Sequence, residues 1–230
     1  MKRQPLVLLP GLGCDGELWA AQVEGLSDIA EVTVGDTLQD DSLPAMARRI
    51  LAAAPDRFAL AGLSMGGYLA FEIMRQAPER VTRLALCDTS AAADTADNKA
   101  FRGAVIAEVQ SGKDYVELSR ASLPRLIAPD AAARVAEAVV AMAVRVGPEV
   151  YIRQQRAIMA RPDSHDLLPG IAVRTLVLVG ERDILTPPAA AESMASVIPG
   201  AALAIIPGSG HLTPMERPEA VTRHLRAWLG

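Results

Sequence analysis

The chain has 230 residues, of which 50% are hydrophobic and 3% aromatic, and its formal net charge at pH 7 is −4. This length suits a single α/β domain, and the acidic balance argues against a nucleic acid or an anionic membrane as the partner. Its two cysteines provide neither a disulfide framework nor a paired metal-ligand spacing. No apolar run is long enough for a signal peptide or a membrane span, so we expect a cytoplasmic protein.

Short apolar runs of strand length recur along the chain, and most are apolar on both faces, as in a buried parallel sheet. These runs are residues 6–9, 32–34, 58–63, 84–87, 175–179 and 203–206. Helix-like segments follow the first three runs, at residues 17–26, 43–54 and 65–76, and a last helix is expected at residues 218–229. Strand–helix alternation of this kind predicts an α/β fold with a doubly wound, mostly parallel sheet of about six strands.

The alternation stops between residues 91 and 168. This segment is rich in alanine, and helices are expected at residues 98–110, 130–146 and 149–160. It is too long to be a plain crossover between two strands. We therefore expect a helical insertion (residues 91–168) within a core formed by residues 1–90 and 169–230, in a single folding unit.

A glycine-rich stretch follows the first strand. Gly11, Gly13 and Gly16 form a G-x-G-x-x-G pattern, and Asp36 comes directly after the second strand. This is the pattern of a dinucleotide-binding turn with its ribose-binding carboxylate. The same glycines would also let backbone N–H groups approach another negatively charged oxygen, so the pattern alone leaves both interpretations open.

A second motif lies at the end of the third strand, where residues 62–66 have the pattern G-x-S-x-G around Ser64. Nucleophilic serines occupy such sharp strand-to-helix turns, because small neighbours let the strand and the helix approach each other. By itself the pattern is weak, since a tight turn without any chemistry has the same sequence. Two later motifs strengthen it.

Asp183 and His211 each follow a later strand, in "VGERD" and "PGSGH". The carboxyl ends of parallel strands are where α/β folds place their sites. The chain order Ser64, Asp183, His211 is characteristic of one of the folds that carry a serine–histidine–aspartate triad. Asp88 also ends a strand and is the alternative acid.

With these motifs the chain resembles an α/β-hydrolase over essentially its full length. The sequences "GLSMGG", "GERD" and "GSGH" stand in the nucleophile, acid and histidine positions, and "LPGLGCDGELW" resembles the oxyanion loop. The resemblance implies that the helical insertion is the family's cap, or lid, before the acid-bearing strand. In two respects the chain departs from the family: Pro10 stands where members often carry histidine, and two N-terminal strands of the usual sheet are missing.

The resemblance also implies roles for individual residues. Ser64, Asp183 and His211 form the catalytic triad, and the backbone N–H groups of Leu12 and Met65 form the oxyanion hole. The glycine-rich stretch is then explained without a nicotinamide or flavin, and neither a cofactor nor a metal is expected. Three further residues are candidates for shaping the pocket: Gly11, Cys14 and Asp15.

The expected function is that of a serine hydrolase of the carboxylesterase type. An insertion rich in Ala, Val, Leu and Met favours a small, largely apolar acyl substrate. The same triad would also serve a thioesterase, a lactonase, a C–C bond hydrolase or a cofactor-free perhydrolase. The non-enzyme alternative is a ligand receptor with a hydrolase fold. The oligomeric state is not predicted.

Overall fold

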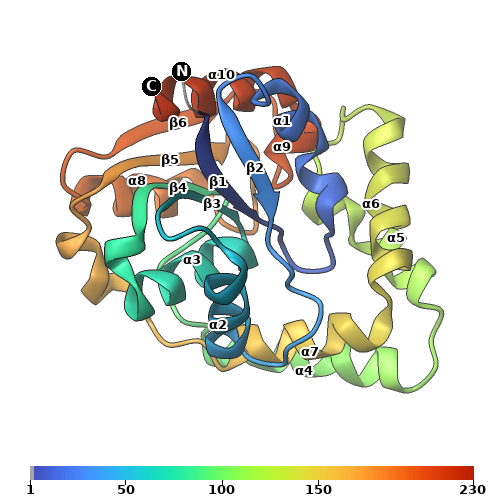
Figure 1. Cartoon of the computed structure of the whole chain (residues 1–230). Coiled ribbons are helices and arrows are strands. Elements are labelled where there is room, and N and C mark those ends of the chain that lie inside the picture. The colour runs from blue at the N-terminus through green and yellow to red at the C-terminus, as the bar shows by residue number, and fades with distance from the viewer. Residues whose placement is uncertain (1–2) are drawn as a thin grey trace.

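A computed structural model describes residues 3–230 (Figure 1). Six strands form one sheet in the order β2-β1-β3-β4-β5-β6, and every neighbouring pair is parallel. The expected doubly wound sheet is therefore confirmed. The strands are β1 (Gln4–Leu9), β2 (Ala30–Val34), β3 (Phe58–Leu63), β4 (Val81–Cys87), β5 (Arg174–Gly180) and β6 (Ala202–Ile206).

Helices cover both faces of the sheet. One face packs against α2 (Leu43–Ala53), α3 (Met65–Gln76) and α8 (Pro188–Val197). The other face packs against α10 (Pro218–Leu229), which also contacts α1 (Ala20–Gly25). The central strand β3 is buried along its whole length, which explains why its sequence is an unbroken apolar run rather than an alternating one.

Four helices occupy the helical insertion between β4 and β5. They are α4 (Ala96–Gln110), α5 (Tyr115–Leu126), α6 (Ala133–Val146) and α7 (Pro148–Met159). Figure 1 shows them beside the ends of β1 and β2, with α5 and α6 along one side and α4 and α7 along another. The sequence did not predict α5, because this helix has no buried residue and contains Pro124.

Short elements complete the chain. A 3-10 turn, η1 (Gly16–Trp19), precedes α1, and α9 (Thr213–Glu216) precedes α10. Two further 3-10 turns are η2 (Pro78–Arg80), before β4, and η3 (His165–Gly170), before β5. The segment predicted as a helix at residues 17–26 is therefore a 3-10 turn followed by a six-residue helix.

The start of α3 lies at backbone contact distance from the sheet. A Cβ atom at Gly66 would overlap the carbonyl oxygen of Leu9 on β1, and one at Gly62 would overlap the carbonyl group of Gly66 itself. Both glycines of the G-x-S-x-G pattern are therefore required sterically. They bring α3 close enough to the sheet for Ser64 to stand at the edge where the parallel strands end.

We expect Gly66→Ala to lower the free energy of unfolding by at least about 2 kcal/mol, because the added methyl group meets rigid backbone. Urea denaturation would measure the loss. Gly103→Ala in α4 is the matched control, since nothing lies within 4 Å of its added methyl group. That control should raise stability by up to about 1 kcal/mol, because alanine is the better helix former. Equal stability of both variants would contradict the steric argument.

Candidate active site

Ser64 occupies a strained position between β3 and α3. Its φ is 54° and its ψ is −113°, in a region that residues with a side chain rarely adopt. Hydrogen bonds fix the turn on both sides: the Ser64 N–H donates to the Cys87 carbonyl at 3.0 Å, and the Ser64 carbonyl accepts from the Thr89 hydroxyl at 2.8 Å. Backbone strain held in this way is typical of functional positions.

Asp183 and His211 meet beyond the ends of β5 and β6. Nδ1 of His211 lies 2.7 Å from Oδ2 of Asp183, and both residues are buried. The other carboxylate oxygen of Asp183 accepts from the N–H groups of Leu185 at 2.8 Å and Thr186 at 3.1 Å. The Thr186 hydroxyl donates to Oδ2 at 2.7 Å. Sequence reasoning missed Thr186, although a threonine three residues after a loop aspartate is a common partner in a local turn.

The electrostatic environment keeps Asp183 ionised. Burial by itself would raise the pKa of this carboxyl, but the charge of His211 and the hydrogen bonds from His211 and Thr186 outweigh burial and lower the pKa below its usual value. An ionised carboxylate at Nδ1 keeps the proton on that nitrogen. The other ring nitrogen, Nε2, is then free to accept a proton.

Asp88, the alternative acid, lies in a different environment. It is fully buried, and its carboxylate accepts from the Gly180 N–H at 2.8 Å and from the Thr213 hydroxyl. Burial, followed by the charge of Asp183, raises the pKa of Asp88 well above its usual range. Among residues 3–230 no hydrogen bond joins Asp88 to His211. Contact and charge therefore both favour Asp183 as the partner of His211.

The glycine turn (residues 11–14) lies beside the serine. The Cys14 N–H donates to the Gly11 carbonyl at 3.2 Å, and Gly13 has a φ of 68°, as the third residue of a type II turn requires. A Cβ atom at Gly11 would lie 3.6 Å from the Cβ atom of Ser64. The turn therefore brings its backbone next to the serine side chain.

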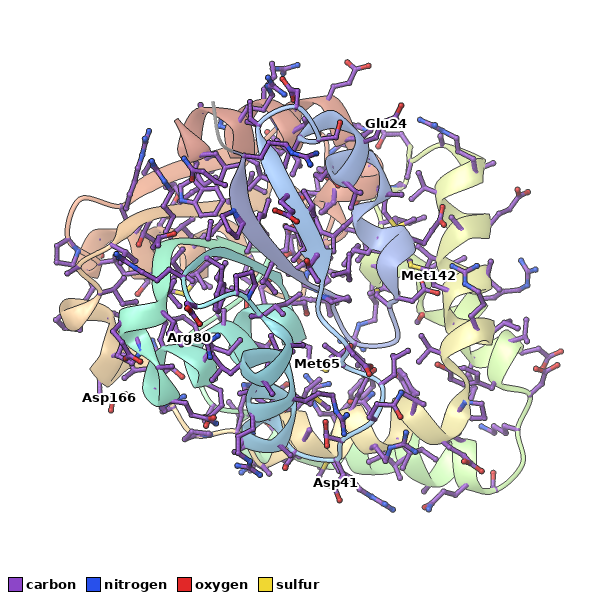
Figure 2. The ribbon with its side chains drawn as sticks, viewed as in Figure 1. Glu24, Asp41, Met65, Arg80, Met142 and Asp166 are labelled. Atoms are coloured by element: carbon purple, nitrogen blue, oxygen red, sulfur yellow. The ribbon has the colours of Figure 1, made fainter. Side chains whose placement is uncertain are left out.

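Two backbone donors are available near Ser64. Within the described range, neither the N–H of Leu12 nor that of Met65 donates to a protein acceptor. Met65 is the first residue of α3, so its N–H belongs to the unpaired, positive end of a helix. Its side chain is fully buried in the interior (Figure 2). Such donors are suited to stabilising an oxygen anion.

The other two pocket candidates, Cys14 in the turn and Asp15 just after it, have structural roles. Cys14 is buried, and burial, with a further contribution from the Asp15 charge, raises the pKa of its thiol to about 12, which argues against a nucleophilic thiolate. Asp15 accepts from the Glu17 N–H and forms an ion pair with Arg145 of α6 at 2.6 Å. It thereby joins the glycine turn to the helical insertion.

The histidine loop (residues 207–212) is held by a glutamate that sequence reasoning missed. Glu216 of α9 is buried, and its carboxylate accepts from the N–H groups of Gly210 at 3.0 Å, Leu212 at 3.2 Å and Ala128 at 2.7 Å. The N–H of His211 donates to the Leu126 carbonyl at 3.0 Å. Both flanks of His211 are therefore fixed, and the helical insertion supplies part of the support.

Asp36 and Gly16, which completed the dinucleotide-binding pattern in the sequence, have other structural roles. Asp36 is exposed and accepts from the Leu38 N–H at 2.9 Å within its own loop. Gly16 opens the 3-10 turn η1 rather than a long helix.

Across residues 3–230, no group of three or more His, Cys, Asp and Glu side chains is placed to hold a metal ion. The helices in that range are all too short or too polar to span a bilayer.

Comparison with known proteins agrees with this fold. The family model for the alpha/beta hydrolase fold matches residues 4–218. A thermophilic esterase from Thermogutta terrifontis is similar with a TM-score of 0.90 and 34% identity, over 98% of this chain and 89% of that one. The enol-lactonase from Burkholderia xenovorans LB400 has a TM-score of 0.88 and 26% identity, over 100% of this chain and 92% of that one.

Curated relatives are similarly distant in sequence. A pimeloyl-acyl-carrier-protein methyl ester esterase from Aromatoleum aromaticum is 27% identical over 238 residues, which cover 95% of each chain. A bifunctional biotin biosynthesis protein from Cellvibrio japonicus is 27% identical over 231 residues, which cover 95% of this chain. The match covers 46% of that protein, so the chain spans about half of its length.

The environment of Asp183 predicts how stability depends on pH. Its pKa is lower in the folded state than the value of about 3.9 for an unfolded chain, so its ionisation stabilises the fold above about pH 4 and ceases to do so as the pH falls through the folded pKa. We expect wild type to be more stable than Asp183→Asn at pH 7, and this difference to shrink below pH 4. Urea denaturation across pH 3–7 would measure it. If the stability difference between wild type and Asp183→Asn did not change with pH, the lowered pKa of Asp183 would be contradicted.

Proposed function

The chain belongs to the α/β-hydrolase fold family, and we propose that it is a serine hydrolase that cleaves the carboxylic ester of a small, largely apolar acyl group. One observation carries the proposal: a buried aspartate–histidine pair, bonded at 2.7 Å, lies at the same sheet edge as a serine held in strained backbone. Strain at Ser64 has no structural benefit of its own, whereas an exposed nucleophile requires such a turn.

The proposed reaction proceeds through an acyl-enzyme. The Ser64 hydroxyl attacks the ester carbonyl while His211 takes its proton, and Asp183 stabilises the imidazolium that forms. The N–H groups of Leu12 and Met65 bind the developing oxygen anion. His211 then gives the proton to the departing alcohol, and water repeats the sequence to release the acid and restore Ser64.

An apolar acyl group is favoured by the surface that the helical insertion turns toward the core. Val135, Val139 and Met142 of α6 are buried in the same cluster as Cys14 and Leu18, which lie in and just beyond the glycine turn. Figure 2 shows Met142 where α6 faces the core. We propose that the helical insertion acts as a lid over the site and supplies an apolar wall to it.

Ester cleavage is also supported by the relatives, whose names include esterases and a methyl ester esterase. Lactone hydrolysis is the second candidate, because the chain is similar to an enol-lactonase over its whole length. A lactone is an internal ester, so both candidates use the same residues. They differ in whether the alcohol leaves or remains attached to the acid.

A fluorophosphonate probe tests whether Ser64 is activated. We expect intact-protein mass spectrometry to find one adduct on wild type and none on Ser64→Ala, because phosphonylation needs a serine deprotonated by a neighbouring base. The labelled peptide should contain Ser64. No adduct on wild type would contradict the proposal and would favour a ligand receptor with this fold.

The identity of the acid is tested by two aspartate variants assayed on a short-chain ester. Asp183→Asn should lower kcat by about 10³- to 10⁴-fold, because an amide at this position supports the wrong histidine tautomer. Asp88→Asn should keep kcat within about threefold, since its side-chain oxygen still accepts from the Gly180 N–H and no charge that contacts His211 is lost. The reverse order of effects would make Asp88 the acid.

A further inference from the structure

Gln154 of α7 joins the helical insertion to the glycine turn. Its side chain is completely buried. Oε1 accepts from the Gly13 N–H at 2.9 Å, and Nε2 donates to the Thr37 carbonyl at 3.1 Å. A single carboxamide therefore bridges the loop after β1 and the loop after β2, and each end of the amide meets the one kind of group that it can bind.

The bond to Gly13 holds the part of the turn that has conformational freedom. Type I and type II turns differ by a rotation of their central peptide, which here joins Leu12 to Gly13. Gly13 has no side chain to oppose that rotation. The acceptor on Gln154 fixes its N–H in one direction, and the ring of Tyr151, one helical turn earlier on α7, would lie 3.4 Å from a Cβ atom at Gly13.

We propose that Gln154 is a positioning residue for the oxyanion hole, and this inference rests on the proposed function. The N–H of Leu12, which would bind the oxygen anion, is one residue from the N–H that Gln154 holds. Loss of the carboxamide frees the central peptide of the turn and leaves two buried backbone groups without partners. The Gly11–Leu12 peptide, which carries the anion-binding N–H, joins the central peptide at the Leu12 Cα, so it is then held from one side only and its direction is less fixed. Ser64, Asp183 and His211 keep their own contacts.

This placement gives the helical insertion a part in the chemical step as well as in covering the site. Gln154 braces the glycine turn through α7. Movement of α7 away from the core would break the bond to Gly13, so a fully formed oxyanion hole requires α7 to be docked.

The test compares an ester with the matching thionoester, in which sulfur replaces the carbonyl oxygen. An oxyanion hole stabilises an oxygen anion far better than the larger, weakly hydrogen-bonding sulfur anion, so the ratio of kcat/KM for the two substrates reports on the hole itself. We expect Gln154→Met to lower kcat/KM for the ester by about 10- to 100-fold, mostly through kcat, because fixed donors act on the transition state. The fall in kcat/KM for the thionoester should be smaller, so the ester-to-thionoester ratio of kcat/KM should fall by at least about fivefold.

Gln22→Met is the matched control. Gln22 is an equally buried glutamine of α1 that donates to the carbonyls of Pro214 and Pro218 rather than binding the glycine turn. Its replacement should lower stability by a similar amount and leave the ester-to-thionoester ratio unchanged. If both variants lowered kcat/KM for the ester and for the thionoester in equal proportion, Gln154 would be merely structural and the proposal would be wrong.

Gln154→Glu covers the case in which Gln154→Met does not fold. Glutamate has nearly the same volume and can still accept from the Gly13 N–H, but as a carboxylate it cannot donate to the Thr37 carbonyl. If Gln154→Met folds, the ester-to-thionoester ratio of Gln154→Glu should lie between those of wild type and Gln154→Met. If Gln154→Met does not fold, the ratio of Gln154→Glu should still be below that of wild type. A wild-type ratio in Gln154→Glu together with an unchanged ratio in any folded Gln154→Met would overturn the proposal.

Failure of the proposed function would give a different result. Wild type would then take no fluorophosphonate adduct and turn over neither substrate, which would overturn both proposals together. Failure of the inference alone would leave wild type labelled and active, with a ratio that does not respond to Gln154.

Discussion

The architecture of the site depends on the contact between α3 and the sheet at Gly66. Because no side chain separates the helix from β1, the chain turns from strand to helix within one residue, and Ser64 occupies that residue. The N–H of Met65 points out of the helix at the same place. Parallel strands then bring the loops after β1, β5 and β6 to the same edge, so residues from four parts of the sequence lie along it.

The helical insertion supports this edge at two points. Gln154 on α7 holds the glycine turn. Leu126, the last residue of α5, holds the histidine loop directly, and Ala128, just after α5, holds it through Glu216. The loop that would bind the oxygen anion and the loop that would move the proton are thus anchored to one unit. In this arrangement hydrogen bonds hold the helical insertion and the two loops together.

The two buried aspartates illustrate how environment separates similar groups. Asp183 is surrounded by donors and by His211, which favour its charge, whereas Asp88 is in a less compensated site beside the Asp183 charge. Asp88 follows β4 and Asp183 follows β5, and these two strands are neighbours in the sheet. Their different contacts, rather than their positions in the chain, determine which one can assist a histidine.

Local pattern predicted much of the fold, and it placed Ser64, Asp183 and His211 at the ends of strands. Apolar runs located the strands, and the motifs around Ser64, Asp183 and His211 located the sheet edge, because these signals lie within a few neighbouring residues. Helix α5 was missed because Pro124 and an unburied surface conceal its periodicity. Gln154 was missed for another reason: it acts on a residue 141 positions away, and only the folded chain brings the two together.

The strain at Ser64 has a consequence for the whole molecule. Among described residues other than glycine, only Ser64 and Asp88 have a positive φ, and they follow the neighbouring strands β3 and β4. Such conformations cost on the order of 1–3 kcal/mol each, against a typical net folding stability of about 5–15 kcal/mol. The protein is therefore less stable than its fold permits, and selection for thermal resistance alone would favour glycine at position 64 and thereby remove the hydroxyl group.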